Sequence, residues 1–360
     1  MTSTTAQGTV LNSLDDDLAA ALGAEVATLW QIPRGPSLSE FRVERLGGRP
    51  VAAVLTTRRP STAATKIAKT WRDTDVPEAD AALNRLVEHV IDDARSRGDA
   101  AVKWETGDGE PAPPYAGFTE MRAPYVSAAG TEGVAGYIYW LHAVTHTESP
   151  YYAQTSTFTC GAVTALLASE IRGSGGFGSA QNNRDQELEF WRQASNFPAC
   201  EPIGLAVALR SSLDDAAGSA PVEVFLDTEG PALLEAYPSG FDRSFREELQ
   251  ASSLSQALGS DIAVNRQRIA IDVLAARIQA GDLALLLINT QLMYGFAAPH
   301  WVLAHSVEDG VVIIDDPTIS SAWGETWVDA HELPIPIEEL DRMIAWGDDG
   351  YRGVVFVRRS

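Results

Sequence analysis

Cysteine and lysine are scarce in this sequence of 360 residues. It holds two cysteines, Cys160 and Cys200, and three lysines, all within the first 103 residues. Two cysteines cannot form the framework of disulfides that stabilises small secreted proteins. We therefore expect reduced thiols that serve packing or chemistry, as in the cytoplasm.

Long apolar runs and a basic beginning are also missing. No stretch of about 18 apolar residues is present, as a transmembrane helix would require. The first residues, MTSTTAQGTVLNSLDDD, contain neither the basic nor the apolar part of a secretion signal. The sequence thus predicts a cytoplasmic protein that does not contact a membrane.

Basic residues are outnumbered, 27 to 49, which gives a net charge of -22. Residues 1–149 hold 14 basic and 20 acidic residues, and residues 150–360 hold 13 and 29, so the net charges are -6 and -16. Such a charge argues against a nucleic-acid binder. In the second part the negative charge favours a cationic amine as ligand.

The length predicts two domains, because a domain has roughly 150 residues.

The first part predicts an α/β domain at residues 14–147, after a disordered tail at residues 1–13. Leucine, valine and isoleucine share one helical face over 81–97, and Gly98 ends that helix. Gly47-Gly48 is typical of a hairpin turn between two strands. The expected elements are strands at 41–46 and 51–57, a helix at 81–97, and strands at 100–105 and 122–128.

This order of elements resembles the core of the GNAT acetyltransferase fold over roughly residues 25–130, and Gly117-Phe118 resembles a turn of that family. The family binds the pyrophosphate of acetyl-CoA on a glycine-containing loop at a helix N-terminus, through main-chain amides. The corresponding stretch, residues 75–80, reads DVPEAD, with no glycine and three carboxylates that would repel a pyrophosphate. We therefore expect a degenerate GNAT-like domain that serves as a scaffold or docking surface.

A basic stretch interrupts the acidity of this first part. Five cations lie within fifteen residues, and no acid intervenes. Either this is the solvated face of a helix, or it docks an acidic partner such as an acyl carrier protein. The five are Arg58, Arg59, Lys66, Lys69 and Arg72.

The second part contains a pattern that favours thiol chemistry. Cys160 precedes a run of small and apolar residues in helical order, so it should lie at a helix N-terminus, where the helix dipole stabilises a thiolate. Gln154, six residues earlier, could donate its side-chain amide to a developing oxyanion, together with the backbone N–H of Cys160.

Three further segments predict an antiparallel meander, at residues 284–289, 299–306 and 310–317. His300 opens the middle strand and Asp316 ends the third, and a turn at residues 308–310 could bring these ends together. A carboxylate beside His300 would fix its tautomer and stabilise the imidazolium. Such an imidazolium is what a thiolate nucleophile requires. Asp315 points to the opposite side, so only one of the two aspartates can serve His300.

Gln-x5-Cys-Gly-Ala, His-Trp-Val-x-x-His and the final Asp-Pro closely resemble the papain-like cysteine peptidases that remove double-glycine leaders in bacteriocin export, and their soluble relatives. The resemblance covers roughly residues 150–335. It implies an α+β domain, a helix packed on an antiparallel sheet, at residues 148–360. It also implies that Cys160 is the nucleophile, His300 the base, Asp316 the orienting acid and Gln154 the oxyanion donor.

The Cys160–His300 interval is longer than in that family, so residues 173–261 are predicted to form an inserted lid. The lid would exclude water, which favours transfer of the acyl group to an amine over hydrolysis. The arrangement is also similar to the amide-forming condensing enzymes of lincosamide antibiotic biosynthesis. Three functions therefore stand: an amide-forming thiol acyltransferase, a cysteine peptidase or amidase, and a non-catalytic binding module.

Other chemically notable residues are interpreted as structural. Cys200 lacks partners of the kind that surround Cys160, and His305 should face away from His300 on the same strand. His142 and His146 lie four residues apart with Glu148 nearby, but no cysteine cluster or HExxH pattern accompanies them. The sequence thus predicts neither a metal nor a cofactor.

Overall fold

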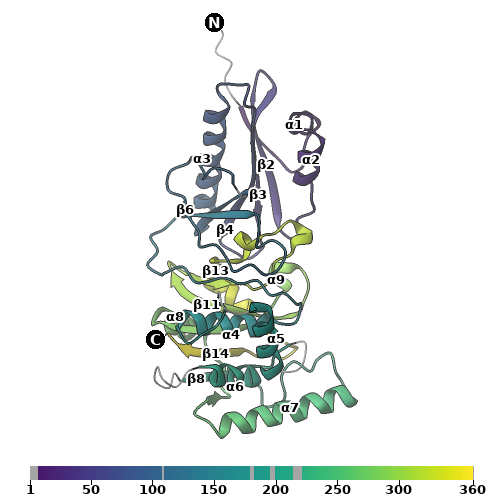
Figure 1. Ribbon diagram of the computed structural model, residues 1–360, viewed down its shortest axis with the longest axis vertical. Helices are drawn as coiled ribbons and strands as arrows, with labels where there is room; N and C mark the ends of the chain where they lie inside the picture. Colours follow the sequence, from purple (N-terminus) through teal and green to yellow (C-terminus); the bar gives the residue numbers. More distant parts are fainter. Residues whose placement is uncertain (1–6, 108, 179–181, 195–198, 214–220, 360) are drawn as a thin grey trace.

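The computed structural model describes residues 7–107, 109–178, 182–194, 199–213 and 221–359. Two seven-stranded sheets lie one above the other along the long axis of the molecule (Figure 1). The N-terminal sheet forms the upper unit with α1, α2 and α3, and the C-terminal sheet forms the lower unit. The chain therefore has the mixed α+β fold with two units that the sequence predicts.

The N-terminal sheet has the strand order β1-β2-β3-β4-β5-β7-β6. Only β4 and β5 pair in parallel, and α3 connects them, which makes this unit GNAT-like. Its strands are β1 (Gln7–Leu11), β2 (Leu38–Leu46), β3 (Arg49–Arg58), β4 (Ala64–Arg72), β5 (Ala101–Gly107), β6 (Thr119–Glu120) and β7 (Val134–Trp140). Its helices are α1 (Asp16–Leu22), α2 (Ala24–Trp30) and α3 (Ala79–Arg97).

The predicted hairpin and helix of this unit are confirmed. Gly47 and Gly48 both have positive φ, 61° and 85°, as a tight turn between β2 and β3 requires. Gly98 ends α3 in the left-handed conformation. The buried face of α3 packs with β3, β4 and β5 in one apolar cluster.

Three expectations for this unit are wrong. Residues 7–11 of the predicted tail form β1, which pairs with β2 and adds a third strand to the hairpin of β2 and β3. Residues 1–6 lie outside the described part. The basic stretch runs from the end of β3 through a turn to the end of β4 and contains no helix. The strand predicted at 122–128 does not form: of these residues only Tyr125 makes an isolated bridge, to Tyr152. Pro124 has no N–H to donate to a strand pairing. The strand that pairs with β5 is instead β7.

The C-terminal sheet has the order β13-β12-β11-β10-β14-β8-β9, and the predicted meander forms its middle. Its strands are β8 (Val222–Leu226), β9 (Ala263–Asn265), β10 (Asp282–Asn289), β11 (Pro299–Glu308), β12 (Val311–Asp315), β13 (Leu333–Pro336) and β14 (Gly353–Arg358). The helices are α4 (Cys160–Ile171), α5 (Asn183–Ala194), α6 (Pro202–Ser212), α7 (Phe241–Leu258), α8 (Ile271–Gln279), α9 (Gln291–Tyr294), α10 (Trp327–Ala330) and α11 (Ile337–Met343).

Both faces of this sheet are covered. Alternate residues of β10 point to opposite sides: Leu283, Leu285 and Leu287 pack with α4 and α6, while Leu286 and Ile288 pack with α8 and α11. The two-sided burial explains why β10 is an unbroken apolar run. Within the described residues, no helix has the length and apolar character that a membrane span requires.

Candidate active site

The thiol of Cys160 lies where the sequence places it, at the first residue of α4. This helix is buried along ten of its residues, against β11 and the helices of the same layer. The side chain of Cys160 lines a pocket of about 260 Å³ and is only 5% exposed. Cys160 thus stands at the end of α4 where the free main-chain amides carry partial positive charge.

His300 comes from the start of β11 and lines the same pocket as Cys160, whose thiol is close enough to affect the imidazole. On its other side, the Nε2 atom of His300 lies 2.8 Å from the Oδ1 atom of Asp316. The structure thus brings Cys160 and His300 to one pocket and joins His300 to Asp316 by a hydrogen bond. Asp315 lies elsewhere, with its Oδ1 atom 2.8 Å from the Nδ1 atom of His331.

The electrostatics of this chain favour a charged imidazole. Burial opposes the imidazolium, but the charge of Asp316, the hydrogen bond that this carboxylate accepts and the neighbouring Cys160 raise the pKa of His300 to about 10. Burial likewise opposes the carboxylate, yet His300, Arg59 and Tyr294 hold the pKa of Asp316 well below its usual value. At neutral pH the site therefore contains an imidazolium between a carboxylate and the sulfur.

The second oxygen of Asp316 is held by residues that the sequence did not indicate. Tyr294, at the end of α9, donates its hydroxyl to Oδ2 at 2.6 Å, and Arg59 donates Nη1 at 2.9 Å. The backbone N–H of Thr318 donates to Oδ1 at 2.9 Å. Since Arg59 follows β3, the GNAT-like unit supplies part of the environment of this carboxylate.

Arg59 also pairs with a second buried acid, Glu325, through two hydrogen bonds of 2.8 and 2.9 Å. We expect Arg59→Met to lower the free energy of unfolding by about 3–5 kcal/mol, because it leaves buried carboxylates without their cation. Chemical denaturation would measure this loss. Arg58→Met is the control: Arg58 is part-exposed, 4.0 Å from Asp99, and its loss should cost at most about 1 kcal/mol. Equal stability of the two variants would contradict the role assigned to Arg59.

Gln154 lies at the same pocket as Cys160 and His300. Its backbone N–H donates to the carbonyl oxygen of Pro317 at 2.8 Å, which ties the loop before α4 to the loop after Asp316. Its Oε1 atom is buried and has no hydrogen-bond partner among the described residues. Oε1 is an acceptor, so a developing oxyanion would have to be bound by the other end of the amide, the Nε2 group, which is its donor.

The loop before Cys160 is fixed by Glu187, a buried acid on α5 that sequence reasoning missed. Its carboxylate accepts hydrogen bonds from the backbone N–H and hydroxyl of Thr155 at 2.8 and 2.7 Å, from the hydroxyl of Tyr152 at 3.0 Å, and from the hydroxyl of Thr159. One side chain thus orders both the Gln154 region and the residue before the nucleophile. A glutamate in a charged helix gave no signal of this role.

We expect Glu187→Gln to lower kcat by up to about 100-fold, because displacement of the loop would misplace the reacting atoms. An amide cannot accept all four hydrogen bonds, so the free energy of unfolding should fall by about 1.5–3 kcal/mol. The matched control is Glu189→Gln on the same helix, an exposed glutamate that pairs only with neighbours on α5. Steady-state kinetics would measure kcat for both variants, and only Glu187→Gln should show the loss. Similar kcat values for the two would show that Glu187 does not order the site.

Two of the five cations of the basic stretch, Arg59 and Lys66, are not available at the surface for docking. Arg59 and Lys66 are buried, and Lys66 pairs with Glu105 at 2.9 Å and with Asp329 of the C-terminal unit. Lys69 pairs with Glu105, and Arg72 with Asp80. β4 directs alternate side chains inward, so its cations meet acids of both units.

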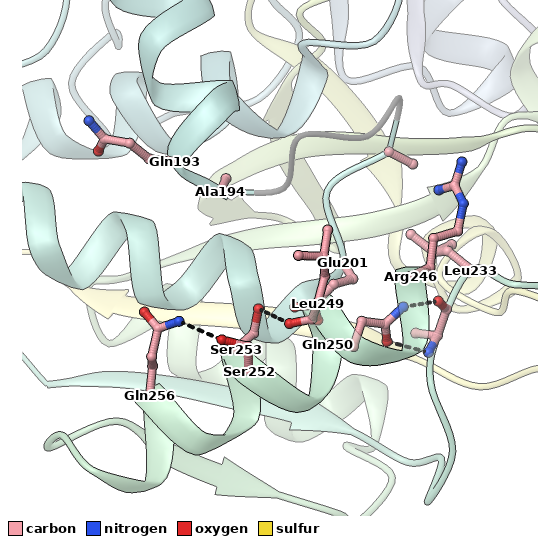
Figure 2. Close-up of a pocket in the computed structure, with 12 residues that line it drawn as sticks. Gln193, Ala194, Glu201, Leu233, Arg246, Leu249, Gln250, Ser252, Ser253 and Gln256 are labelled. Carbon is pink, nitrogen blue, oxygen red and sulfur yellow. Dashed lines mark hydrogen bonds between the residues drawn. The ribbon is translucent and has the colours of Figure 1, made fainter. Parts of the chain in front are cut away.

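Residues 173–261 were expected to form a lid, and this is wrong for their described part. β8 is a strand of the C-terminal sheet, α6 packs on that sheet, and none of the described residues lines the Cys160 pocket. Residues of α5 and α7, with Glu201 and others, instead line a separate pocket of about 180 Å³; Figure 2 shows these residues. The apolar residues of α6 and β8 explain the outcome, because they extend the core.

Cys200 is fully buried behind the start of α4, where a Cβ on Gly161 would approach its sulfur to 3.2 Å. It does not line the Cys160 pocket, in keeping with a structural residue. The pocket is otherwise lined by residues in and beside α9, by the start of β11 and by the loop after β12. These residues are Thr290, Tyr294, Phe296, Ala298, Pro299, Thr318 and Ser320, together with Thr157 before α4.

Residues 149–358 match the model of the Peptidase_C39 like family. The chain therefore belongs to this family, and its C-terminal unit is a cysteine-peptidase-like domain. No curated protein is similar enough to the chain to count as a match.

Solved structures that are similar to the chain cover its N-terminal part. They include the ribosomal-protein-S18-alanine N-acetyltransferase from Escherichia coli, with 17% identity, 39% of this chain, 98% of that chain and a TM-score of 0.28. An acetyltransferase from Bacillus subtilis in complex with CoA has 12% identity and a TM-score of 0.28; the match covers 38% of this chain and 100% of that chain. The IAA acetyltransferase from Bacillus cereus has 13% identity and a TM-score of 0.29; the match covers 38% of this chain and 100% of that chain. TM-scores this low support no inference about the activity of the chain.

Proposed function

We propose that this protein catalyses acyl transfer through a thioester on Cys160. The observation that carries this proposal is that Cys160 and His300 line one pocket of about 260 Å³ and that Asp316 hydrogen bonds to the imidazole of His300. A buried thiol with a packing role alone would not need an imidazole whose second nitrogen is oriented by a carboxylate.

The proposed reaction has two halves. The Cys160 thiolate attacks the carbonyl carbon of the acyl donor, and the Gln154 amide and the Cys160 backbone N–H stabilise the oxyanion. The tetrahedral intermediate then expels the leaving group, which takes its proton from the His300 imidazolium. In the second half an amine attacks the thioester and passes a proton to His300, and Cys160 leaves as the thiolate. Asp316 keeps the imidazole oriented throughout.

The acceptor that we propose is a cationic amine, and the donor is a small acyl thioester, free or on a carrier protein. The net charge of -16 on residues 150–360 supports the amine, because an acidic domain attracts cations. The Cys160 pocket supports a small acyl group, since its volume and its apolar lining suit a short chain.

The family match favours a second candidate, a cysteine peptidase or amidase. The same residues would then deliver the acyl group of a peptide to water. In either case we assign the GNAT-like unit the role of a scaffold that holds Asp316 through Arg59.

Incubation with a short-chain acyl N-acetylcysteamine thioester tests the two candidates. We expect an amide when ethylenediamine is present, and little hydrolysis when ethylene glycol replaces it. Release of the free acid at the same rate in both cases, with cleavage of unstructured peptides, would favour the peptidase. No turnover of either thioester or peptides would contradict both candidates.

A further inference from the structure

A second cluster of histidines and carboxylates lies buried on the other side of Asp315 from the candidate active site. It is centred on His305 of β11, Asp315 of β12 and Glu332, which precedes β13. All three side chains are at least 97% buried. The facing oxygen and nitrogen atoms of the three lie within 4.8 Å of one another. No residue of this cluster has a part in the proposed acyl transfer.

The outer oxygens of the two carboxylates already have partners. His331 contacts Oδ1 of Asp315 at 2.8 Å through its Nδ1 atom and Glu148 at 3.0 Å through Nε2. His146 contacts Oε2 of Glu332 at 2.5 Å through Nε2 and Glu308 at 3.2 Å through Nδ1. Each of these imidazoles thus has an acid at both nitrogens, which fixes its orientation and leaves the inner oxygens of Asp315 and Glu332 facing His305.

His305 differs from these two histidines. Neither of its ring nitrogens has a hydrogen-bond partner among the described residues, although the ring is fully buried. Its Nε2 atom lies 3.6 Å from Oδ2 of Asp315 and 3.6 Å from Oε1 of Glu332. Both distances are too long for a hydrogen bond. A buried imidazole without partners is costly, so this arrangement requires an explanation.

Among the described residues, the hydrogen bonds to the inner oxygens come from a single residue, Ser149. Ser149 directs its hydroxyl to Oδ2 of Asp315 and also lies 3.3 Å from Oε1 of Glu332. A hydroxyl has one proton and can donate to only one of these two oxygens. The backbone N–H of Ser149 donates to Glu332 at 3.1 Å. Two acceptor oxygens and the His305 ring therefore lie close together, and Ser149 supplies only one N–H and one O–H to the two oxygens.

We propose that His305, Asp315 and Glu332 bind a divalent transition-metal ion, for which Zn²⁺ is the natural probe. Ligands at about 2.0–2.1 Å around tetrahedral zinc are separated from one another by roughly 3.4 Å. The 3.6 Å separations of the His305 nitrogen from the two inner oxygens are close to that value. One imidazole with two carboxylates suits zinc better than magnesium, which prefers oxygen ligands alone.

The surrounding residues fit the proposed site. His331 and His146 orient the two ligating carboxylates from outside, as second partners do at known metal sites. Ser149 belongs to the segment between the two units, so a bound ion would fasten this segment to β11 and β12. The site is closed by protein on all sides, which is typical of a structural rather than a catalytic metal.

Metal binding by the full chain tests the proposal, and the Cys160→Ala background removes the one thiol that would compete at the active site. The protein is stripped with dipicolinate, and Zn²⁺ uptake is then measured by competition with a chromophoric chelator. We expect one Zn²⁺ per chain and a higher melting temperature when Zn²⁺ is added. Co²⁺ should give the intense visible absorption of a tetrahedral site.

His305→Gln and Glu332→Gln should each weaken Zn²⁺ binding by about 100-fold or more, since loss of an outer partner alone costs up to that factor. The control is His142→Gln, the same substitution at an exposed histidine outside the cluster, and it should bind like the parent. If the stripped parent fails to take up zinc, or if His305→Gln binds as tightly as His142→Gln, the proposal is wrong. The parent measurement decides even where a ligand variant does not fold. The inference is independent of the proposed function.

Discussion

Cys160→Ala and His300→Ala are each expected to reduce turnover of an acyl thioester on the order of 10⁶-fold, to the background rate. The first variant removes the atom that forms the covalent bond, and the second removes the group that carries its proton. Because the two residues act as one unit, the double variant should lose no more than either single one. Single-turnover kinetics with each purified variant would measure the effect.

The matched control is Cys200→Ala, which removes the other thiol of the chain without touching the pocket. It should retain turnover, since Cys200 packs behind α4. Far-UV circular dichroism should show that all variants keep the native fold. Near-normal rates in either Cys160→Ala or His300→Ala would mean that the reaction does not pass through a Cys160 thioester.

Asp316→Asn is expected to lower kcat by roughly 10²- to 10⁴-fold, less than Cys160→Ala, because the asparagine allows the wrong tautomer of His300. In this variant the basic limb of the profile of activity against pH should also shift to lower pH. In the wild type, activity should fall as the pH rises through about 10, where His300 loses its proton. Without the charge of Asp316 the pKa of His300 falls, so the same loss should occur at lower pH.

The same linkage predicts a change in stability. The pKa of His300 is raised by folding, so its interaction with Asp316 stabilises the protein fully below about 6.5, the pKa of an unfolded histidine. That contribution is lost as the pH rises through about 10. Asp309→Asn, in the exposed turn between β11 and β12, should leave both profiles unchanged. A basic limb in Asp316→Asn at the wild-type pH would contradict the pairing with His300.

Local patterns were enough to predict the residues that meet at the pocket. Cys160 begins a helix, His300 begins a strand and Asp316 follows a strand, and each position can be inferred from periodicity and turn residues alone. The meander then determines which strand ends lie together, because β10, β11 and β12 follow one another in the sequence and each pairs antiparallel with the next.

What could not be predicted depends on contacts between distant segments. Arg59 lies 257 positions from Asp316, and the basic stretch around it looked like a solvated surface. Glu187 is one of several acids on α5, and only tertiary packing distinguishes it from its exposed neighbours. The cluster around His305 joins residues of the inter-unit segment with two strands and a loop, so no spacing in the chain indicates it.

The most direct test of the account is to locate the acyl group after a short pulse with the acyl thioester. Intact-protein mass spectrometry should show one acyl adduct, and peptide mapping should place it on Cys160. The adduct should be absent from Cys160→Ala and should disappear when an amine is added. A wild-type protein that stays unmodified while it turns over substrate, or an adduct on Cys200 instead, would contradict the account.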